Sequence, residues 1–203
     1  MNEYSLFAPL YDWILYPFMR GIRRDVLGTV QRLKPKRILD VCCGTGDQLR
    51  LLQQEGIEAL GIDLSKAMLK VAGGGKTPVK CLAQDATAMA FRDQSFDLAM
   101  VSFALHETEW ESAGRILQEI HRILKPAGML LIVDYALADS AGAVAQTVIH
   151  GIEFMAGRRH FSNFRAFRRK GGLQRLVDPE RFMPIQARYH GYRSVVVDLL
   201  QKI

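Results

Sequence analysis

The sequence predicts an α/β fold in which a parallel sheet carries helices on both faces. Segments with strand character alternate with segments of helical periodicity, at the spacing that βαβ units require. One of these strands ends in Asp40 and runs directly into a turn that contains Gly44 and Gly46. The next strand ends in Asp63, 23 residues after Asp40. Because open α/β sheets bind ligands at the carboxyl edge of their strands, this order predicts a ligand site beside the glycine turn.

The expected elements follow one another along the whole chain. We expect strands at 37–42, 58–62, 78–83, 96–102 and 128–134, with helices near 47–55, 65–72 and 109–124. Residues 4–33 repeat apolar and aromatic positions at helical spacing, with a break near Pro17. Thr108 and Glu111 form a Thr-X-X-Glu capping box that marks the start of the helix near 109–124. A helix at 139–156 before Gly157, and two strands at 183–190 and 193–200, complete the order.

Length and composition fit a single domain. A chain of 203 residues and 22.9 kDa is long enough for one α/β domain with a full core. It has no run of 18 apolar residues and no signal-peptide pattern at its N-terminus, so we expect a cytoplasmic protein. The three cysteines form no Cys-X-X-Cys pair, which indicates reduced thiols. The sequence has no His/Asp cluster at ligand spacing, so we expect no metal site.

The residues around the turn distinguish between nucleoside ligands. A P-loop requires Gly-Lys-Ser/Thr, but Gly46 is followed by Asp47. A dinucleotide-binding turn has a third glycine where this chain has Leu49. Two acids, Asp40 and Asp47, would repel a pyrophosphate, whereas they suit a cofactor that carries an ammonium and a sulfonium. The turn therefore favours S-adenosylmethionine.

Five ordered segments resemble class I S-adenosylmethionine-dependent methyltransferases, specifically the small branch of ubiquinone/menaquinone biosynthesis C-methyltransferases. The segments are 39–47, 61–65 with Met68, 84–86, 96–102 and 123–134, so the resemblance covers about residues 36–135. Cys42 stands where many relatives have the first glycine of the turn.

The resemblance implies a fold and a division of the chain. The fold is a Rossmann-like seven-stranded sheet, made of five parallel strands and a C-terminal antiparallel hairpin. The single methyltransferase domain would comprise an N-terminal helical lid (1–34), a cofactor-binding core (36–135), a helical, basic substrate segment (136–180) and the C-terminal strands (181–203).

The resemblance also implies the residues that bind the cofactor. Asp63 would accept both ribose hydroxyls, and Asp40 or Asp47 would neutralise the amino group. The backbone of Gly44 and Gly46 would approach the methionyl and ribose parts. The adenine and the rest of the cofactor would contact Leu64, Met68, Asp85, the amide of Ala86, and Ser102. For each acid the alternative is a helix N-cap or a surface carboxylate.

The acceptor side follows the fourth strand. His106 is the best candidate for a general base, because its unperturbed pKa suits proton transfer near neutrality. Glu107 could orient the imidazole, while the alternative for His106 is a structural histidine. Related quinone methyltransferases commonly carry Arg-Asn at these two positions, so the resemblance leaves the acceptor open. Tyr135 is a further pocket residue, and Tyr4 or Tyr11 would close on the methionine portion; for each of these the alternative is core packing.

Residues 158–175 carry seven Arg or Lys and no acid. Phe161, Phe164 and Phe167 recur among them, so a helix here would bear an aromatic stripe flanked by guanidiniums. This pattern predicts a surface for anionic lipid or for an anionic acceptor, with polar contacts from His160, Asn163 and Arg168. The alternative is that the phenylalanines are core and the arginines a solvated face.

Together these features predict a methyltransferase that uses S-adenosyl-L-methionine, releases S-adenosyl-L-homocysteine, and is cytoplasmic with possible peripheral membrane contact. The methyl group would pass by in-line displacement to a small-molecule or lipid-like acceptor. Two alternatives stay open. One is an RNA or protein methyltransferase that docks its substrate on the basic segment, with nucleic acid the less favoured partner. The other is a non-catalytic, cofactor-binding regulatory protein.

Overall fold

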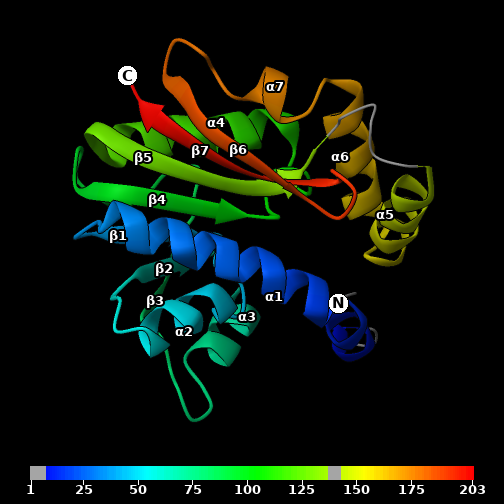
Figure 1. The fold of residues 1–203 in the computed structure, drawn as a ribbon, viewed down its shortest axis with the longest axis horizontal. Coiled ribbons are helices and arrows are strands. Elements are labelled where there is room, and N and C mark those ends of the chain that lie inside the picture. Colours follow the sequence, from blue (N-terminus) through cyan, green and yellow to red (C-terminus); the bar gives the residue numbers. More distant parts are fainter. Residues whose placement is uncertain (1–7, 137–142) are drawn as a thin grey trace.

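The computed structural model describes residues 8–136 and 143–203, and they form a seven-stranded sheet between two layers of helices (Figure 1). The strand order is β3-β2-β1-β4-β5-β7-β6. Neighbouring strands from β1 to β5 are parallel, whereas β7 is antiparallel to both β5 and β6. The strands are β1 (Ile38–Val41), β2 (Leu60–Asp63), β3 (Cys81–Ala83), β4 (Phe96–Ser102), β5 (Leu124–Tyr135), β6 (Phe182–His190) and β7 (Val195–Lys202). The predicted α/β sheet with a C-terminal antiparallel hairpin is confirmed.

The central strands are buried on both faces, as parallel strands between helices must be. Successive side chains of a strand point to opposite faces, so β4 sends Met100 toward the cluster packed on α1 and Val101 toward the cluster packed on α4. In Figure 1, α1 runs across the sheet, with β4 and β5 above it and α2, α3, β2 and β3 below it. The helices are α1 (Ala8–Leu33), α2 (Asp47–Gln54), α3 (Lys66–Ala72), α4 (Trp110–Ile123), α5 (Ala143–Met155), α6 (Arg158–Arg169) and α7 (Leu173–Leu176).

The N-terminal helix differs from the expectation in two ways. It continues through Pro17, where a break was predicted. The proline removes only one backbone hydrogen-bond donor, and core packing of the residues after it stabilises the helix. Ile22, Val26 and Val30 are each 1% exposed and belong to the core. The C-terminal half of α1 therefore covers the sheet, and a lid role is left to its first half. Tyr4 and the side chain of Tyr11 lie outside the described residues.

The predicted capping box does not form. The hydroxyl of Thr108 donates to the carbonyl of Ala104, at 2.7 Å, and the N-cap of α4 is Glu109, which makes no side-chain cap. Strand β5 begins at Leu124, four residues before the expected start at 128, because Leu124 pairs with Phe96 of β4. The short helix α7 was not expected, and Asp139, the predicted start of the helix before Gly157, lies outside the described residues.

None of the helices within 8–136 and 143–203 combines the length and apolar character needed to span a bilayer.

Candidate functional site

The ligand edge of the sheet is built by the ends of three neighbouring strands. Asp40 lies in β1, Asp63 ends β2, and Asp85 follows β3 by two residues. The register pairs Asp40 with Gly61 and Asp63 with Ala83. These acids therefore lie along one edge of the sheet, beside the glycine turn that joins β1 to α2.

Asp63 links this edge to the turn. Its Oδ2 accepts a hydrogen bond from the amide of Gly44, at 2.8 Å, and its Oδ1 accepts one from the amide of Ser65, at 2.8 Å. These bonds fix the carboxylate in orientation, while each oxygen keeps a further lone pair for a ligand hydroxyl. Two parallel acceptors on a half-buried carboxylate suit the two hydroxyls of a ribose.

The two glycines of the turn have different surroundings, although both have positive φ. A Cβ added to Gly46 would lie 2.7 Å from Cγ2 of Val79 and 3.2 Å from Cβ of Ala72. A Cβ added to Gly44 would meet no heavy atom of the described chain within 4 Å. Gly46 therefore permits close packing inside the protein, whereas Gly44 exposes its backbone to open space where a ligand can approach.

The two acids predicted to meet the cofactor's amino group differ as well. Asp40 is 3% exposed, and burial together with the negative charge of Asp63 raises its pKa to about 7. Asp47 is nearly half exposed and pairs with Arg23 of α1, at 2.9 Å, and with Arg50, at 3.6 Å. Because cations of the protein already compensate the charge of Asp47, the geometry favours Asp40 as the partner of an ammonium.

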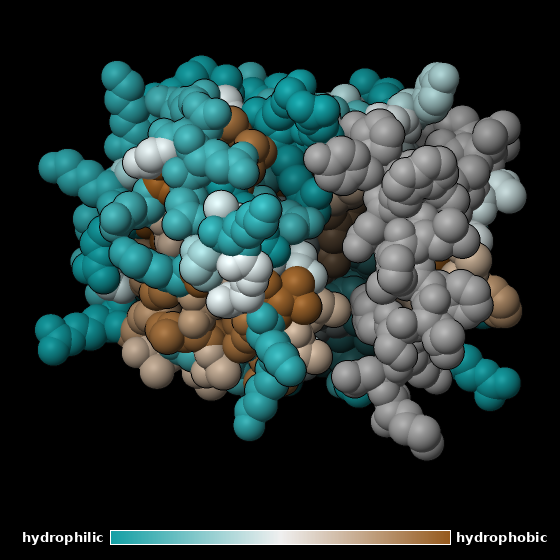
Figure 2. Space-filling model, turned by 90° about the horizontal axis from the view of Figure 1, so that it is seen from below, coloured by the Kyte–Doolittle hydropathy of each residue, from teal (hydrophilic) through white to brown (hydrophobic). Residues whose placement is uncertain are grey.

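An apolar area adjoins Asp63. The side chain of Leu64 is 71% exposed and Met68 is half-buried on α3, where Ser65 caps the helix by accepting from the Met68 amide. The face seen from below, where α3 and β3 lie, shows apolar residues gathered in one area among hydrophilic ones (Figure 2). Exposed apolar side chains in α3 and β3 include Val71 and Leu82.

The remaining predicted cofactor residues lie at the same edge or just beyond it. Asp85 is exposed and its carboxylate accepts from the amide and hydroxyl of Thr87, each at 2.8 Å, which holds the pKa of Asp85 below its usual value. Ala86 is buried next to it. Ser102 ends β4 and is half-buried. Their contacts with a cofactor stay predictions.

His106 lies in a buried charge cluster beyond the end of β4. The imidazole is 3% exposed; its Nδ1 lies 2.6 Å from Oδ1 of Asp134 and its Nε2 3.5 Å from Oε1 of Glu153. The hydroxyl of Tyr135 donates to the same Oε1 of Glu153, at 2.8 Å. Asp134, at the end of β5, also accepts from the backbone amides of Leu105, His106 and Tyr135.

This environment argues against a general base at His106. Burial alone would lower the pKa of His106, but the charge of Asp134 and the hydrogen bonds to Asp134 and Glu153 outweigh it and raise the pKa to about 10. The imidazole is therefore protonated near neutral pH, and both ring nitrogens already face carboxylates. The geometry favours the structural alternative, with His106 as a cation that holds β4, β5 and α5 together.

The other predicted substrate residues gather around this cluster. Nδ1 of His160 lies 3.2 Å from a carboxylate oxygen of Glu107, so α6 is tied to the segment after β4. Asn163 donates to the backbone carbonyl of Glu107, at 2.7 Å. Nη1 of Arg168 lies 2.9 Å from Nε2 of His150, on α5. Tyr135 is buried beneath them.

The aromatic stripe of the basic segment is mostly core. Phe164 and Phe167 are 1% and 2% exposed, and both rings pack edge-on against His106. Phe161 is half-buried, with Arg165 over its ring. The packing alternative therefore holds for the phenylalanines, while the exposed arginines lie on the opposite face of α6.

Comparison with known proteins finds a family model and curated relatives that are similar to this chain. Residues 39–132 match the family model described as "Methyltransferase domain". A little under half of the chain is therefore similar to methyltransferase domains. It is 33% identical over 117 residues to the demethylmenaquinone methyltransferase of Renibacterium salmoninarum, covering 58% of this chain and 48% of the relative. It is 32% identical over 140 residues to the demethylmenaquinone methyltransferase of Thermotoga maritima, covering 66% and 60%. The chain thus spans roughly half of the length of these relatives.

Solved structures of methyltransferases share the fold of this chain. Magnesium protoporphyrin IX methyltransferase from Synechocystis PCC 6803, with bound SAH, superposes with a TM-score of 0.63 at 14% identity, covering 91% of this chain and 84% of that one. A SAM-dependent methyltransferase from Methanosarcina mazei gives 0.59 at 20% identity, covering 82% and 92%.

Two residues of the buried charge cluster, Asp134 and Glu153, were not predicted as site residues. Asp134 ends a buried strand, as Asp63 does, and that pattern could have identified it. Glu153 is the single acid in the mostly apolar sequence of α5, which is the signal that could have found it. Neither signal gives the pairing with His106, because the three residues come from different elements.

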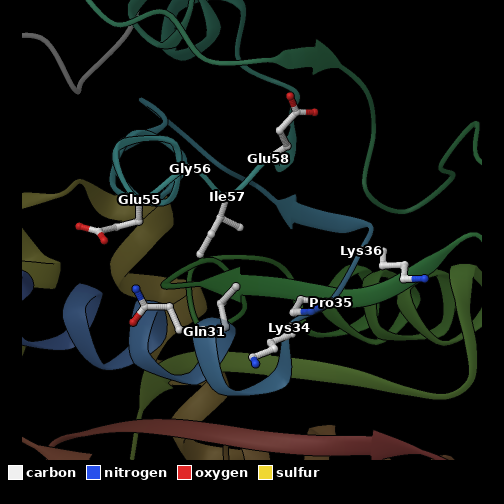
Figure 3. Close-up of a pocket in the computed structure, with 9 residues that line it drawn as sticks. Gln31, Lys34, Pro35, Lys36, Glu55, Gly56, Ile57 and Glu58 are labelled. Carbon is white, nitrogen blue, oxygen red and sulfur yellow. The ribbon is translucent and has the colours of Figure 1, made fainter.

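A cavity of about 390 Å³ lies at the other edge of the sheet (Figure 3). It is lined by the end of α1 with Lys34, and by the segments that precede β1 and β2, including Lys36, Ile57 and Glu58. It contains none of the predicted site residues. A position at the amino ends of the strands separates it from the ligand edge.

Proposed function

We propose that the chain is an S-adenosylmethionine-dependent methyltransferase with a small-molecule or lipid-like acceptor. The observation that carries the proposal is the Asp63 carboxylate, held between the amides of Gly44 and Ser65 beside a glycine that faces open space. The fold, the family match and a neighbouring structure with bound SAH support the same cofactor.

The residues present fit the cofactor part by part. Asp63 would take the ribose hydroxyls, and the exposed Leu64 with Met68 would pack on the adenine, where Asp85 offers a carboxylate to the amino group. Asp40 would face the ammonium, and Gly44 lets the backbone lie against the ligand. When bound, the cofactor supplies an electrophilic methyl group on a sulfonium.

The protein's own contribution to an in-line displacement is alignment and exclusion of water. Positive charge is consumed in the reaction, so no oxyanion-type donor is needed. Asp40 would hold the cofactor's ammonium, and the aromatic side chains after β4 and β5 would exclude water from the acceptor side.

We infer a quinol-type acceptor from the relatives, which are named demethylmenaquinone methyltransferases. The rings of Phe103, Tyr135 and Phe164 around His106 support an apolar, aromatic acceptor side. No observation favours RNA, a protein substrate or a non-catalytic role over this.

We also infer that the outer face of α6 contacts an anionic membrane surface, from which a lipid-like acceptor would be taken. Arg158, Arg165 and Arg169 are exposed and follow one another at i, i+7 and i+11, so they share one face of the helix. Phe154 and Met155, at the end of α5, are 69% and 63% exposed just before this helix. Guanidiniums beside exposed apolar side chains suit a lipid interface. The expected cytoplasmic location stays a prediction.

Calorimetric titration of S-adenosylmethionine and S-adenosylhomocysteine tests the proposal. We expect micromolar binding to the wild type and a loss of at least about tenfold in Asp63→Ala, because a charged hydrogen-bond acceptor is removed. Asp93→Asn is the matched control, since Asp93 is an exposed acid at the opposite edge of the sheet. Absence of binding by both ligands to the wild type would overturn the proposed function.

A further inference from the structure

Glu153 has a buried oxygen that receives no hydrogen bond from the part of the chain that the structure describes. The residue is 4% exposed, and its Oε1 receives the Tyr135 hydroxyl and faces Nε2 of His106. Its Oε2 is buried and has no hydrogen-bond partner among the described residues. A buried carboxylate oxygen without a donor is costly, and native structures almost always supply one. The orphaned oxygen therefore indicates a donor that the described residues do not supply, such as a bound ligand.

The cluster determines what kind of group could arrive. The two carboxylates of Asp134 and Glu153 flank one imidazolium, His106, so the cluster carries a net charge of about −1. This charge would repel an anion or a hydrogen-bond acceptor, whereas it would favour a hydrogen-bond donor. Two donors already hold Oε1, so the carboxylate cannot rotate to satisfy Oε2 from within the cluster.

The position of Glu153 matches the acceptor side of the domain. His106 follows β4, Asp134 and Tyr135 end β5, and α5 carries Glu153 against them. The rings of Phe103, Tyr135, Phe164 and Phe167 lie 4.5 to 6.4 Å from the His106 ring, centroid to centroid. In such surroundings a neutral hydroxyl on an aromatic ring is cheaper to desolvate than an ammonium.

We propose that Oε2 of Glu153 accepts a hydrogen bond from a hydroxyl on the aromatic ring of the methyl acceptor and thereby fixes which ring atom faces the cofactor. His106 and Tyr135 act as positioning residues, because they hold Oε1 and leave Oε2 available as an acceptor. The inference rests on the proposed function for the identity of the acceptor, but the hydroxyl site itself is testable without methyl transfer.

Binding of two matched probes, 2-naphthol and 2-methoxynaphthalene, measures the hydroxyl directly by fluorescence titration. We expect the wild type to prefer 2-naphthol by about tenfold, the size of one hydrogen bond to a charged group. Glu153→Gln should remove the preference. The amide oxygen of the glutamine would keep the Tyr135 and His106 donors. Its NH₂ group, a hydrogen-bond donor, would then stand where Oε2 of Glu153 is an acceptor.

Controls separate this inference from a folding defect and from the proposed function. Glu58→Gln, at an 87% exposed side chain on the other edge of the sheet, should keep the preference. Calorimetry with S-adenosylhomocysteine shows whether Glu153→Gln keeps a folded cofactor site, and the probes are titrated both with and without that ligand. If the wild type binds neither S-adenosylmethionine nor S-adenosylhomocysteine, the proposed function fails, while the probe preference still decides the hydroxyl site.

Three results would overturn the inference. They are an equal affinity of the wild type for the two probes, an unchanged preference in Glu153→Gln, or tighter binding of 1-naphthylmethylammonium than of 2-naphthol. If Glu153→Gln does not fold, Tyr135→Phe, which frees Oε1 of one donor, should reduce the preference. An unchanged preference in Tyr135→Phe would count against the inference as well.

Discussion

At the scale of single residues, the turn after β1 shows how neighbouring positions of one motif serve different purposes. Gly46 packs against Val79 and Ala72, and Gly44 faces open space while its amide holds Asp63. Cys42, where relatives often have glycine, adopts a positive φ of 57° with a side chain, so the backbone of the turn keeps the glycine-like conformation without the glycine.

The two glycines should therefore fail differently when each is replaced by alanine. Gly46→Ala should lower the free energy of unfolding by about 2 kcal/mol or more, from the positive φ and the clash with Val79. Gly44→Ala should cost about 1 kcal/mol from φ alone but weaken S-adenosylhomocysteine binding at least about tenfold. Urea unfolding and calorimetry measure the two effects. Unchanged S-adenosylhomocysteine binding in Gly44→Ala would show that the ligand does not occupy the open space beside Gly44.

Asp40 should make cofactor binding depend on pH. Burial raises its pKa to about 7, so its ionised fraction rises from about 0.1 at pH 6 to about 0.9 at pH 8. If the ionised form meets the ammonium, the affinity for S-adenosylhomocysteine should increase by about tenfold over this range. Asp40→Asn should abolish the increase, and Asp47→Asn should keep it. The opposite pattern would assign the ammonium to Asp47.

At the scale of elements, the buried cluster joins three parts of the chain that are far apart in sequence. His106 comes from the segment after β4, Asp134 and Tyr135 from β5, and Glu153 from α5. Breaking a buried ion pair leaves an uncompensated charge and is strongly destabilising, so the cluster controls the docking of α5 on the sheet.

Stability should consequently fall on the alkaline side. The pKa of His106 is raised from 6.5 to about 10 in the folded state, so the contribution is complete below pH 6.5 and is lost as pH rises through 10. We expect the free energy of unfolding in urea to decrease by roughly 2–4 kcal/mol between pH 7 and 10. His106→Gln should be less stable at pH 7 and lack this decrease, while His121→Gln should retain it. An imidazole NMR titration with a midpoint near 6.5 would contradict the assignment.

At the scale of the whole molecule, the net charge of +6 is less informative than its distribution. Several of the basic residues of α4 and α6 pair with acids, as Arg159 does with Glu109 and Lys170 with Glu111. The exposed face of α6, beside Phe154 and Met155, concentrates the arginines that could meet a membrane.

Sedimentation with vesicles tests this surface. We expect binding to phosphatidylglycerol vesicles and little binding to phosphatidylcholine vesicles, with a loss of about 10- to 30-fold in the double variant Arg165→Gln, Arg169→Gln, at about 1 kcal/mol per arginine. The matched control is Lys34→Gln with Lys36→Gln, two exposed lysines at the amino edge of the sheet. Equal losses in both double variants would indicate a general charge effect in place of a defined face.

The sequence by itself determined the order of strands and helices, the glycine turn and the acids that end β1 and β2. These are local features, since hydrophobic periodicity and turn residues act within a few positions of one another. What the tertiary structure decided depends on residues that are distant in sequence. It paired Asp47 with Arg23 of α1, buried His106 between Asp134 and Glu153, and turned Phe164 and Phe167 into core. The charge state of a buried group depends on burial and on partners from other elements. The sequence could therefore identify His106 as a candidate site residue, but it could not predict the protonation state of the imidazole.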